Sequence, residues 1–233
     1  MPTPVVLLHG FAATARHWDR VIAQLPTGCF TPIPMNAVDA TPLTPDGVTS
    51  LAGDGTDEQF VLVGYSMGGR LALHTALAMP ERIARLVLIS TGAGIEDKGE
   101  RAARRAADDA LAAEIELGSI SDFIDRWRAV ALFADDPDWV HAEVAADERR
   151  CTPAQLAASI RGLGVGAMTP MCDRLSELHM PVAVLAGAKD VAYVRTGRRL
   201  AAAIPDASFQ ALPGVGHRVA LQAPEAVAQA IAR

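Results

Sequence analysis

The stretch GYSMGGR, residues 64–70, decides the fold of this chain. It follows the apolar run FVLV at residues 60–63 and leads into a helical pattern over Met67–Met79. A Gly-x-Ser-x-Gly at a strand-to-helix junction forms a tight turn that lifts the serine hydroxyl clear of the backbone. The sequence therefore predicts that Ser66 is a nucleophile or base. The structural alternative is a glycine-rich turn whose serine only caps the helix.

Short runs rich in Val, Ile and Leu alternate with helical patterns along the rest of the chain, which is typical of a mainly parallel, doubly wound sheet covered by helices. The expected strands are 5–8, 30–33, 60–63, 86–89, 182–186 and 208–212. The expected helices between them are 17–25, 67–79, 197–204 and 224–232. These patterns predict an α/β fold.

Two segments interrupt this alternation. Residues 35–57 are dense in Pro, Asp, Thr and Gly, and we expect a long loop there. Residues 92–172 instead contain helical patterns, in RAARRAADDALAAEIE and over 120–133 and 153–163. Because ligands bind beyond the carboxyl ends of parallel strands, helices inserted at that edge would cover the site. We therefore expect a core of residues 1–91 and 173–233 with a helical lid over 92–172.

A catalytic serine needs an imidazole, which is itself oriented by a carboxylate. His217 lies in LPGVGHRVA after the last expected strand, and Asp190 ends VAVLAGAKD after the strand before it. Both would lie at the same sheet edge as Ser66, in the chain order Ser, Asp, His that is associated with the α/β-hydrolase fold. Asp173 and Asp206 are rivals for the acid, but neither directly follows a long apolar run.

The negative charge that develops on a substrate oxygen needs hydrogen-bond donors as well. The backbone N–H of Met67, directly after the serine, and that of Phe11, after the first strand, are the candidates for an oxyanion hole. His9 is expected to shape the loop without taking protons. The remaining histidines are interpreted as surface or packed residues: His17, His74, His141 and His179.

Composition excludes several classes of protein. The 233 residues, half of them apolar, are enough for one sizeable core. A net charge of −6 without a long basic run gives no electrostatic argument for nucleic acid. Three cysteines without metal-ligand spacing predict reduced thiols, and we expect neither a metal nor an organic cofactor. No apolar stretch is long enough to cross a bilayer, and MPTPVVLLHG is interpreted as a first strand, so we expect a cytoplasmic protein.

Four motifs give the chain a resemblance to the α/β-hydrolase superfamily over nearly its whole length. They are HGF at 9–11, GYSMGG at 64–69, GAKD at 187–190 and GVGH at 214–217. The resemblance implies the fold and a Ser-His-Asp triad. It leaves the reaction open, because this fold supports esterases, lipases, peroxidases, C–C bond hydrolases and lyases.

A closer resemblance is to the 2-succinyl-6-hydroxy-2,4-cyclohexadiene-1-carboxylate synthases (MenH-like), lyases of menaquinone biosynthesis. The similar stretches are HGFAATARHW, GYSMGGRLAL, ERAARRAADDALA, FIDRWRAVALF and PAQLAASIRGLGVGA. The resemblance implies a carbon–oxygen lyase that eliminates pyruvate from a small, carboxylate-bearing substrate, with Ser66 as the base. The substrate-binding residues that it implies are Tyr65, Arg70, Arg104, Trp127 and either Arg149 or Arg150, of which we select Arg150. Guanidinium groups suit this role because they bind carboxylates bidentately.

The segment 35–59 departs from that family, whose members carry a Pro-Gly-His-Gly-like stretch and a helix in this interval. The segment normally borders the pocket, so the departure concerns the substrate more than the triad. A serine hydrolase, either a carboxylesterase or a C–C bond hydrolase of a small molecule, is therefore the alternative. A receptor without catalysis is disfavoured because no triad position is lost.

Overall fold

A sheet of six parallel strands forms the centre of the protein, whose computed structural model describes residues 1–233. The strands are β1 (Thr3–Leu8), β2 (Phe30–Met35), β3 (Phe60–Tyr65), β4 (Ile83–Ile89), β5 (Val182–Gly187) and β6 (Ala207–Leu212). Their order across the sheet is β2-β1-β3-β4-β5-β6. All six strands predicted from the sequence are confirmed, and so is their parallel arrangement.

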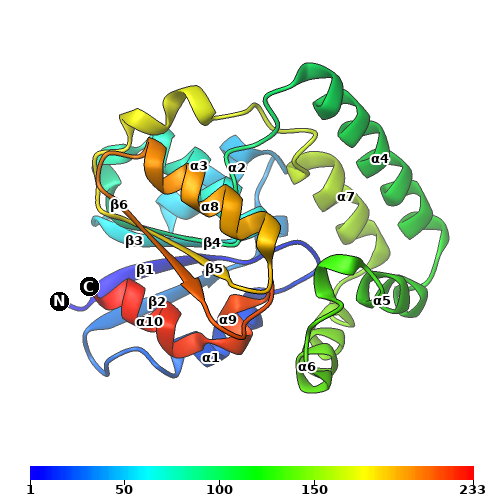
Figure 1. Ribbon diagram of the computed structural model, residues 1–233, viewed down its shortest axis with the longest axis horizontal. Coiled ribbons are helices and arrows are strands. Elements are labelled where there is room, and N and C mark those ends of the chain that lie inside the picture. The colour runs from blue at the N-terminus through cyan, green and yellow to red at the C-terminus, as the bar shows by residue number, and fades with distance from the viewer.

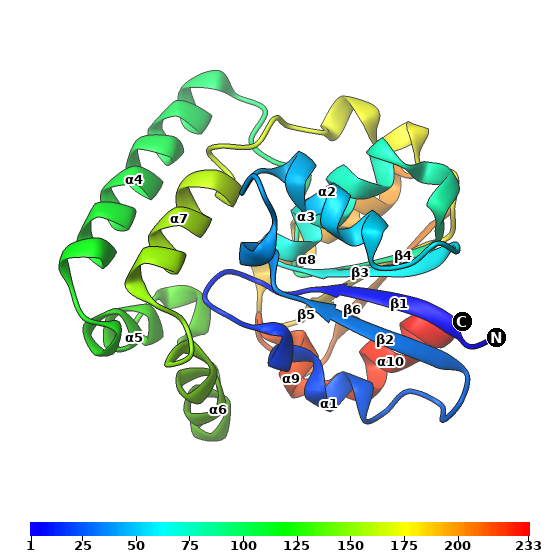
Figure 2. The ribbon, with the colours of Figure 1, turned by 180° about the vertical axis from the view of Figure 1, so that it is seen from behind.

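Helices cover both faces of this sheet (Figures 1 and 2). One face carries α2 (Pro45–Asp54), α3 (Met67–Ala78) and α8 (Val191–Ala203), and the other carries α1 (Asp19–Ile22), α9 (Val219–Gln222) and α10 (Pro224–Ala232). Side chains of β1 alternate between the two cores, since Val6 and Leu8 pack on the first face and Val5 and Leu7 on the second. This alternation explains why the strand is a continuous apolar run.

Helix α2 corrects the prediction of a long loop over residues 35–57. The Thr44 hydroxyl accepts a hydrogen bond from the Gly47 N–H at 3.2 Å, and Pro45 occupies the first turn, where it costs no hydrogen bond. Val48 and Ala52 are fully buried against the core that contains α3. The turn-forming residues of this segment therefore begin a helix, and a short apolar face is enough to hold it. A short 3₁₀ helix, η2 (Ala37–Asp39), precedes it.

Other helix boundaries differ from the predictions by a few residues. The expected helix 17–25 is a 3₁₀ turn, η1 (Ala15–Trp18), followed by the short α1. The helix expected over 197–204 is α8, which already begins at Val191 because the Asp190 side chain accepts a hydrogen bond from the Tyr193 N–H. Another 3₁₀ turn, η3 (Pro80–Arg82), precedes β4.

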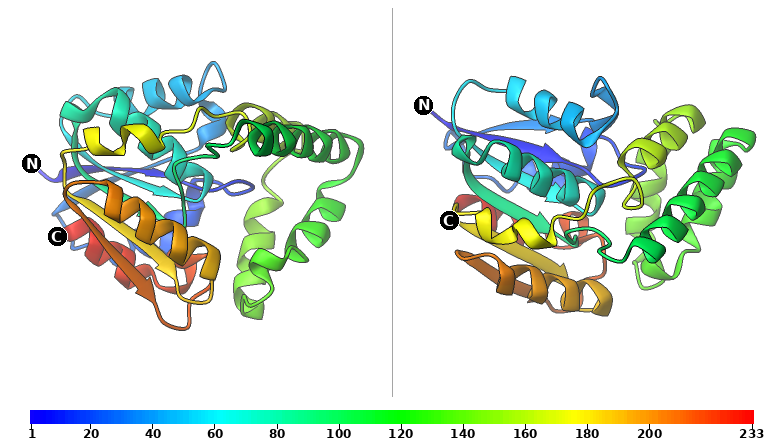
Figure 3. Two further views of the ribbon diagram at one scale, coloured as in Figure 1. Left: turned by 45° about the horizontal axis from the view of Figure 1, so that its top comes forward. Right: turned by 90° about the horizontal axis from the view of Figure 1, so that it is seen from above.

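Residues 92–172, called the lid segment below, form helices beyond the carboxyl end of the sheet (Figure 3). They are α4 (Lys98–Leu117), α5 (Ile120–Arg128), η4 (Ala131–Phe133), α6 (Asp138–Glu148) and α7 (Pro153–Leu163), and η5 (Cys172–Glu177) leads back to the sheet. The expected helix 120–133 divides into α5 and η4, and α6 was not predicted.

The lid segment has a small apolar core of its own. Ile115, Phe123 and Ile160 from α4, α5 and α7 pack together, and Ala12 of the loop after β1 belongs to the same cluster. Capping boxes at Ser119 and Thr152 begin α5 and α7. No helix combines the length and the apolar character that crossing a membrane requires.

The Thr44 cap gives a test of helix α2. Thr44→Ala is expected to lower the free energy of unfolding by about 1 kcal/mol, because the Gly47 N–H loses its acceptor. Chemical denaturation of the variant and the wild type measures this difference.

The matched control is Ser50→Ala, at an exposed position in the same helix. It should leave stability unchanged or raise it slightly, since alanine has the higher helix propensity. Equal effects of the two substitutions would contradict the cap at Thr44.

Candidate active site

Ser66 lies in a sharp turn between β3 and α3, and its backbone has φ 52° and ψ −111°. A positive φ is strained for any residue except glycine, and strain of this kind is typical of functional sites. The surrounding chain holds the turn, because the Ser66 N–H donates to the Ile89 carbonyl at 2.9 Å and the Thr91 hydroxyl donates to the Ser66 carbonyl at 2.8 Å. Gly68 allows α3 to approach β1, since a Cβ there would collide with the Leu8 carbonyl.

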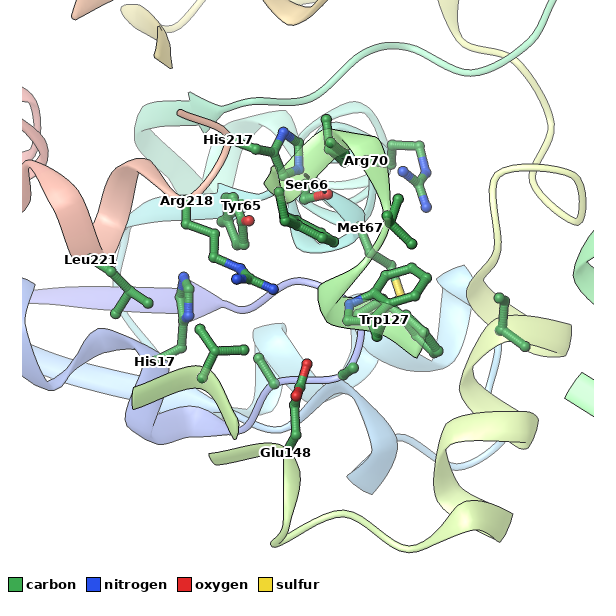
Figure 4. A pocket seen from close by; sticks show the side chains of 18 of the residues that line it. His17, Tyr65, Ser66, Met67, Arg70, Trp127, Glu148, His217, Arg218 and Leu221 are labelled. Atoms are coloured by element: carbon green, nitrogen blue, oxygen red, sulfur yellow. Dashed lines mark hydrogen bonds between the residues drawn. The ribbon is translucent and has the colours of Figure 1, made fainter. Parts of the chain in front are cut away.

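Three predicted residues form one hydrogen-bonded chain at the carboxyl end of the sheet, and Figure 4 shows two of them, Ser66 and His217. His217 Nε2 lies 3.1 Å from the Ser66 hydroxyl, and His217 Nδ1 lies 2.6 Å from Asp190 Oδ2. The other Asp190 oxygen accepts a hydrogen bond from the Tyr193 N–H at 3.2 Å. His217 is buried, with 1% of its surface exposed. This arrangement allows the imidazole to take the serine proton while the carboxylate holds the ring.

Two backbone N–H groups near Ser66 have no acceptor within the protein. Phe11, in the loop after β1, donates to no backbone or side-chain oxygen, and Met67 is the first residue of α3, where the N–H lacks an intrahelical partner. Ala12 next to Phe11 also has a positive φ of 58°, so this loop makes a tight turn. Both predicted donors line the cavity above the serine. Unpaired amides of this kind are suited to an oxyanion.

A cavity of about 860 Å³ lies between the sheet edge and the lid segment. Ser66 and His217 line it, and so do all five residues predicted to bind substrate: Tyr65, Arg70, Arg104, Trp127 and Arg150. Arg149 does not line it, which separates it from its neighbour Arg150.

Arg70 is a partly buried cation without a carboxylate partner. Its Nε is buried and unpaired, and its only hydrogen bond is a long one of 3.4 Å from Nη2 to the Leu163 carbonyl. Burial lowers the pKa of Arg70 to about 10, so the side chain is still charged at neutral pH. Because a buried charge without a partner is costly, the Arg70 side of the cavity is suited to a ligand carboxylate.

The two other predicted arginines differ from Arg70, because one already has a carboxylate partner and the other is exposed. Arg104 Nε donates to Asp108 Oδ1 at 2.8 Å, one helical turn away, and half of the Arg104 side chain is exposed. Arg150 is exposed, lies at the edge of the cavity, and forms no ion pair. The three arginines therefore differ in how strongly the protein itself already neutralises them.

Trp127 connects the lid segment to the loop after β1. Its ring lies 5.2 Å from that of Phe11 and 5.7 Å from that of Phe123, measured between centroids. Tyr65 is buried beneath the cavity, where its ring centroid lies 5.4 Å from that of His217. Burial raises the pKa of Tyr65, so its hydroxyl stays protonated.

Sequence reasoning missed three residues of this cavity. His17, interpreted as a surface or packed residue, stacks on Tyr65 with a centroid distance of 4.7 Å and also lines the cavity. Burial lowers the pKa of His17 to about 3, so its ring is neutral. Arg218 is buried beside His217 and lines the cavity. It could have been predicted as a cavity residue, because it directly follows the predicted histidine in the sequence. Glu148 ends a helix that was itself not predicted.

Glu148 is a buried carboxyl group facing this cavity (Figure 4). It is 3% exposed, and no hydrogen bond reaches its side chain. Burial raises the pKa of Glu148 to about 7, with nearby Arg218 acting in the opposite direction. The group therefore titrates near neutral pH. No cluster of His, Cys, Asp and Glu side chains is arranged to hold a metal ion.

Comparison with known proteins identifies the class of protein that this fold and site define. A family model described as "Alpha/beta hydrolase family" matches residues 5–230, so the chain belongs to the alpha/beta hydrolase family.

Particular relatives narrow the comparison. A Bacillus subtilis (strain 168) protein, provisionally named 2-succinyl-6-hydroxy-2,4-cyclohexadiene-1-carboxylate synthase, is 28% identical over 94% of this chain and 85% of its own length. The solved structure of MenH from S. aureus is 26% identical, covers 99% of this chain and 92% of its own, and superposes with a TM-score of 0.90. A pimeloyl-[acyl-carrier protein] methyl ester esterase of Aromatoleum aromaticum is 30% identical over 95% of this chain and 93% of its own.

The raised pKa of Glu148 predicts a pH-dependent stability. In the folded protein this pKa of about 7 lies above the ordinary value of 4.5, so between these values the folded state binds more protons than the unfolded one. The free energy of unfolding should therefore fall as pH rises through this range. Glu148→Gln should remove a decline on the order of 3 kcal/mol, measured by denaturation from about pH 5 to about pH 8.

Glu58→Gln changes an exposed carboxylate that precedes β3, at the opposite end of this strand from Ser66, and as the matched control it should keep the wild-type pH dependence. Parallel stability curves for the wild type and Glu148→Gln would contradict the raised pKa.

Proposed function

We propose that this protein is a lyase with a Ser66-His217-Asp190 triad that eliminates pyruvate from a polyanionic, carboxylate-bearing precursor of menaquinone. The observation behind the proposal is the partly buried Arg70 guanidinium, whose buried Nε is unpaired, which lacks a carboxylate partner and which lies in the same cavity as Ser66. The similarity to MenH from S. aureus, over 99% of this chain, supports the same reaction class.

In this reaction the triad removes one proton from the substrate. His217 Nε2 takes the Ser66 hydroxyl proton, and the serine oxygen then takes a proton from a ring carbon of the substrate. The electron pair left on the ring forms a new double bond as the bond between the ring and the pyruvate oxygen breaks. Asp190 stabilises the imidazolium meanwhile, through the 2.6 Å hydrogen bond to Nδ1. The leaving enolate becomes pyruvate when it takes up a proton, and the imidazolium releases the proton that it gained, which returns the triad to its starting state.

The oxyanion donors and the arginines have separate roles in this scheme. The N–H groups of Phe11 and Met67 stabilise the enolate-like charge that follows proton removal. Arg70 binds one substrate carboxylate inside the cavity, and Arg104 and Arg150 bind carboxylates nearer its edge. Trp127 and Tyr65 form apolar walls, and the lid segment covers the site and excludes water.

A serine hydrolase is the second candidate, and a specific observation favours it. The 30% identical relative is a methyl ester esterase, and hydrolysis of an ester needs the same triad and the same oxyanion donors. Apolar side chains, including Val130, Leu132 and Phe133, form part of the cavity wall and would accept an acyl chain. In that case Ser66 would be acylated instead of acting as a base.

Pyruvate release from the menaquinone precursor decides between the two reactions. Wild type is expected to release pyruvate efficiently, and Ser66→Ala should lose at least a factor of about 10³ in kcat. Arg70→Met should raise KM for the precursor by about 10- to 100-fold, because one buried carboxylate contact is lost. A coupled assay for pyruvate measures all three proteins.

Hydrolysis of a short, uncharged activated ester by the same three proteins is the control. Arg70→Met should leave this reaction within about threefold of wild type, since the ester has no carboxylate to bind. Ester turnover that depends on Ser66, without pyruvate release, would refute the lyase and establish the hydrolase.

A further inference from the structure

Asp136 of the lid segment, in the turn between η4 and α6, lies in a buried network next to the catalytic histidine. Its Oδ2 accepts a hydrogen bond from Arg218 Nη1 at 2.8 Å, and both side chains are at most 5% exposed. Its Oδ1 accepts a hydrogen bond from Gln222 Nε2 at 2.7 Å. One lid carboxylate therefore binds two side chains of the core, one at each oxygen.

Those two side chains fix the residues on either side of His217. Arg218 follows His217 directly, and the side-chain oxygen Oε1 of Gln222 accepts a hydrogen bond at 3.1 Å from the N–H of Gly216, which precedes His217. The lid carboxylate also lies directly against this loop, because a Cβ added at Gly216 would stand 3.2 Å from Asp136 Oδ1. The core holds the same loop as well, since the Val215 carbonyl accepts a hydrogen bond from the Lys189 N–H at 3.0 Å and His217 Nδ1 lies 2.6 Å from Asp190, so the Asp136 network adds to these restraints.

The lid segment makes a second contact with the same loop through Phe133. The Arg218 guanidinium lies 3.9 Å from the centre of the Phe133 ring, and that ring lies 5.9 Å from the His217 ring. Arg218 is thus enclosed between a carboxylate and an aromatic face, both from the lid segment (Figure 4 shows its position beside the cavity). Its charge is already neutralised, in contrast to that of Arg70.

We propose that Asp136 is a positioning residue that, through its hydrogen bonds to Arg218 and Gln222, holds the loop of His217 in the place where the imidazole reaches Ser66. The inference rests on the proposed function of the triad. A 3.1 Å hydrogen bond between His217 and Ser66 is sensitive to small shifts of the loop, and a misplacement of about 1 Å can cost about 100-fold in rate.

The lid segment has a second ion pair to the core that provides a matched control. Arg20 of α1 forms an ion pair with Glu143 of α6 at 2.6 Å and lies over the Trp139 ring at 4.6 Å. This pair joins α6, the helix that follows Asp136, to the core without contacting the His217 loop. Arg20→Gln therefore removes a lid contact and leaves the Asp136 network intact.

The test uses an activated alkyl phosphonate ester, which reports on Ser66 without the natural substrate. The serine oxygen forms a bond to phosphorus, the activated leaving group departs, and His217 takes the hydroxyl proton. The rate of this labelling is expected to fall about 10- to 100-fold in Asp136→Asn and to stay within about twofold of wild type in Arg20→Gln. The dissociation constant of a non-reactive analogue should change by less than about threefold in both.

A proton NMR spectrum measures the position of a resonance that a loss of stability alone would not change. The short bond between His217 Nδ1 and Asp190 predicts a low-field N–H resonance in the wild type, and it should shift or broaden in Asp136→Asn at temperatures where that variant is folded. Gln222→Met keeps the Asp136–Arg218 ion pair and removes the hydrogen bonds of Gln222 to Asp136 and to Gly216. It should slow labelling by about three- to tenfold, and it decides the question if Asp136→Asn does not fold.

The possible results separate the two proposals. Labelling that is equally slow in the wild type and in Ser66→Ala would refute the triad and, with it, the positioning role. Fast, serine-dependent labelling in the wild type that is equally fast in Asp136→Asn or in Gln222→Met would overturn the positioning role alone. Slow labelling in both of these variants, with Arg20→Gln unchanged, would support it.

Discussion

The backbone of Ser66, held at a positive φ of 52°, is the constraint on which the site depends. The cost of this conformation, on the order of 1–3 kcal/mol, is met by the contacts around the turn. These contacts are backbone hydrogen bonds to β4, the Thr91 hydroxyl, and the close approach of α3 to β1 at Gly68. The turn places the hydroxyl beside His217 and the first free amide of α3 beside the hydroxyl. A parallel sheet with a glycine-lined junction thus supplies the nucleophile and part of the oxyanion hole together.

Charge in the cavity is distributed unevenly, and the distribution separates structural arginines from available ones. Arg218 and Arg104 have carboxylate partners at 2.8 Å, whereas Arg70 has only a distant carbonyl. If only the stability of the protein mattered, Arg70 would be paired with a carboxylate or replaced by an uncharged residue. A partly buried, unpaired Arg70 is expected where a ligand supplies the missing anion, and the bound ligand would then stabilise the folded protein.

The sequence allowed a correct prediction wherever a single local pattern determines the structure. The inner strands β1, β3, β4 and β5 each contain a continuous apolar run. Ser66 and Asp190 follow such runs and His217 follows β6, so that their common edge could be predicted from parallel topology. Helix α2 was not predictable in this way, because the same Thr, Pro and Asp that cap a helix also form loops. Glu148 and Asp136 depend on contacts between segments distant in sequence, and no local pattern reports such contacts.

The small core of the lid segment includes Ala12, and the Trp127 ring packs on Phe11, so the loop that carries one of the two free amides is itself part of the lid packing. The lid segment and this loop therefore have to be exchanged together when parts of related proteins are combined. A lid transplanted from a relative to change the substrate would have to bring residues 9–14 with it. Recombination between relatives should accordingly succeed at boundaries that keep these two segments from the same parent, and fail at those that separate them.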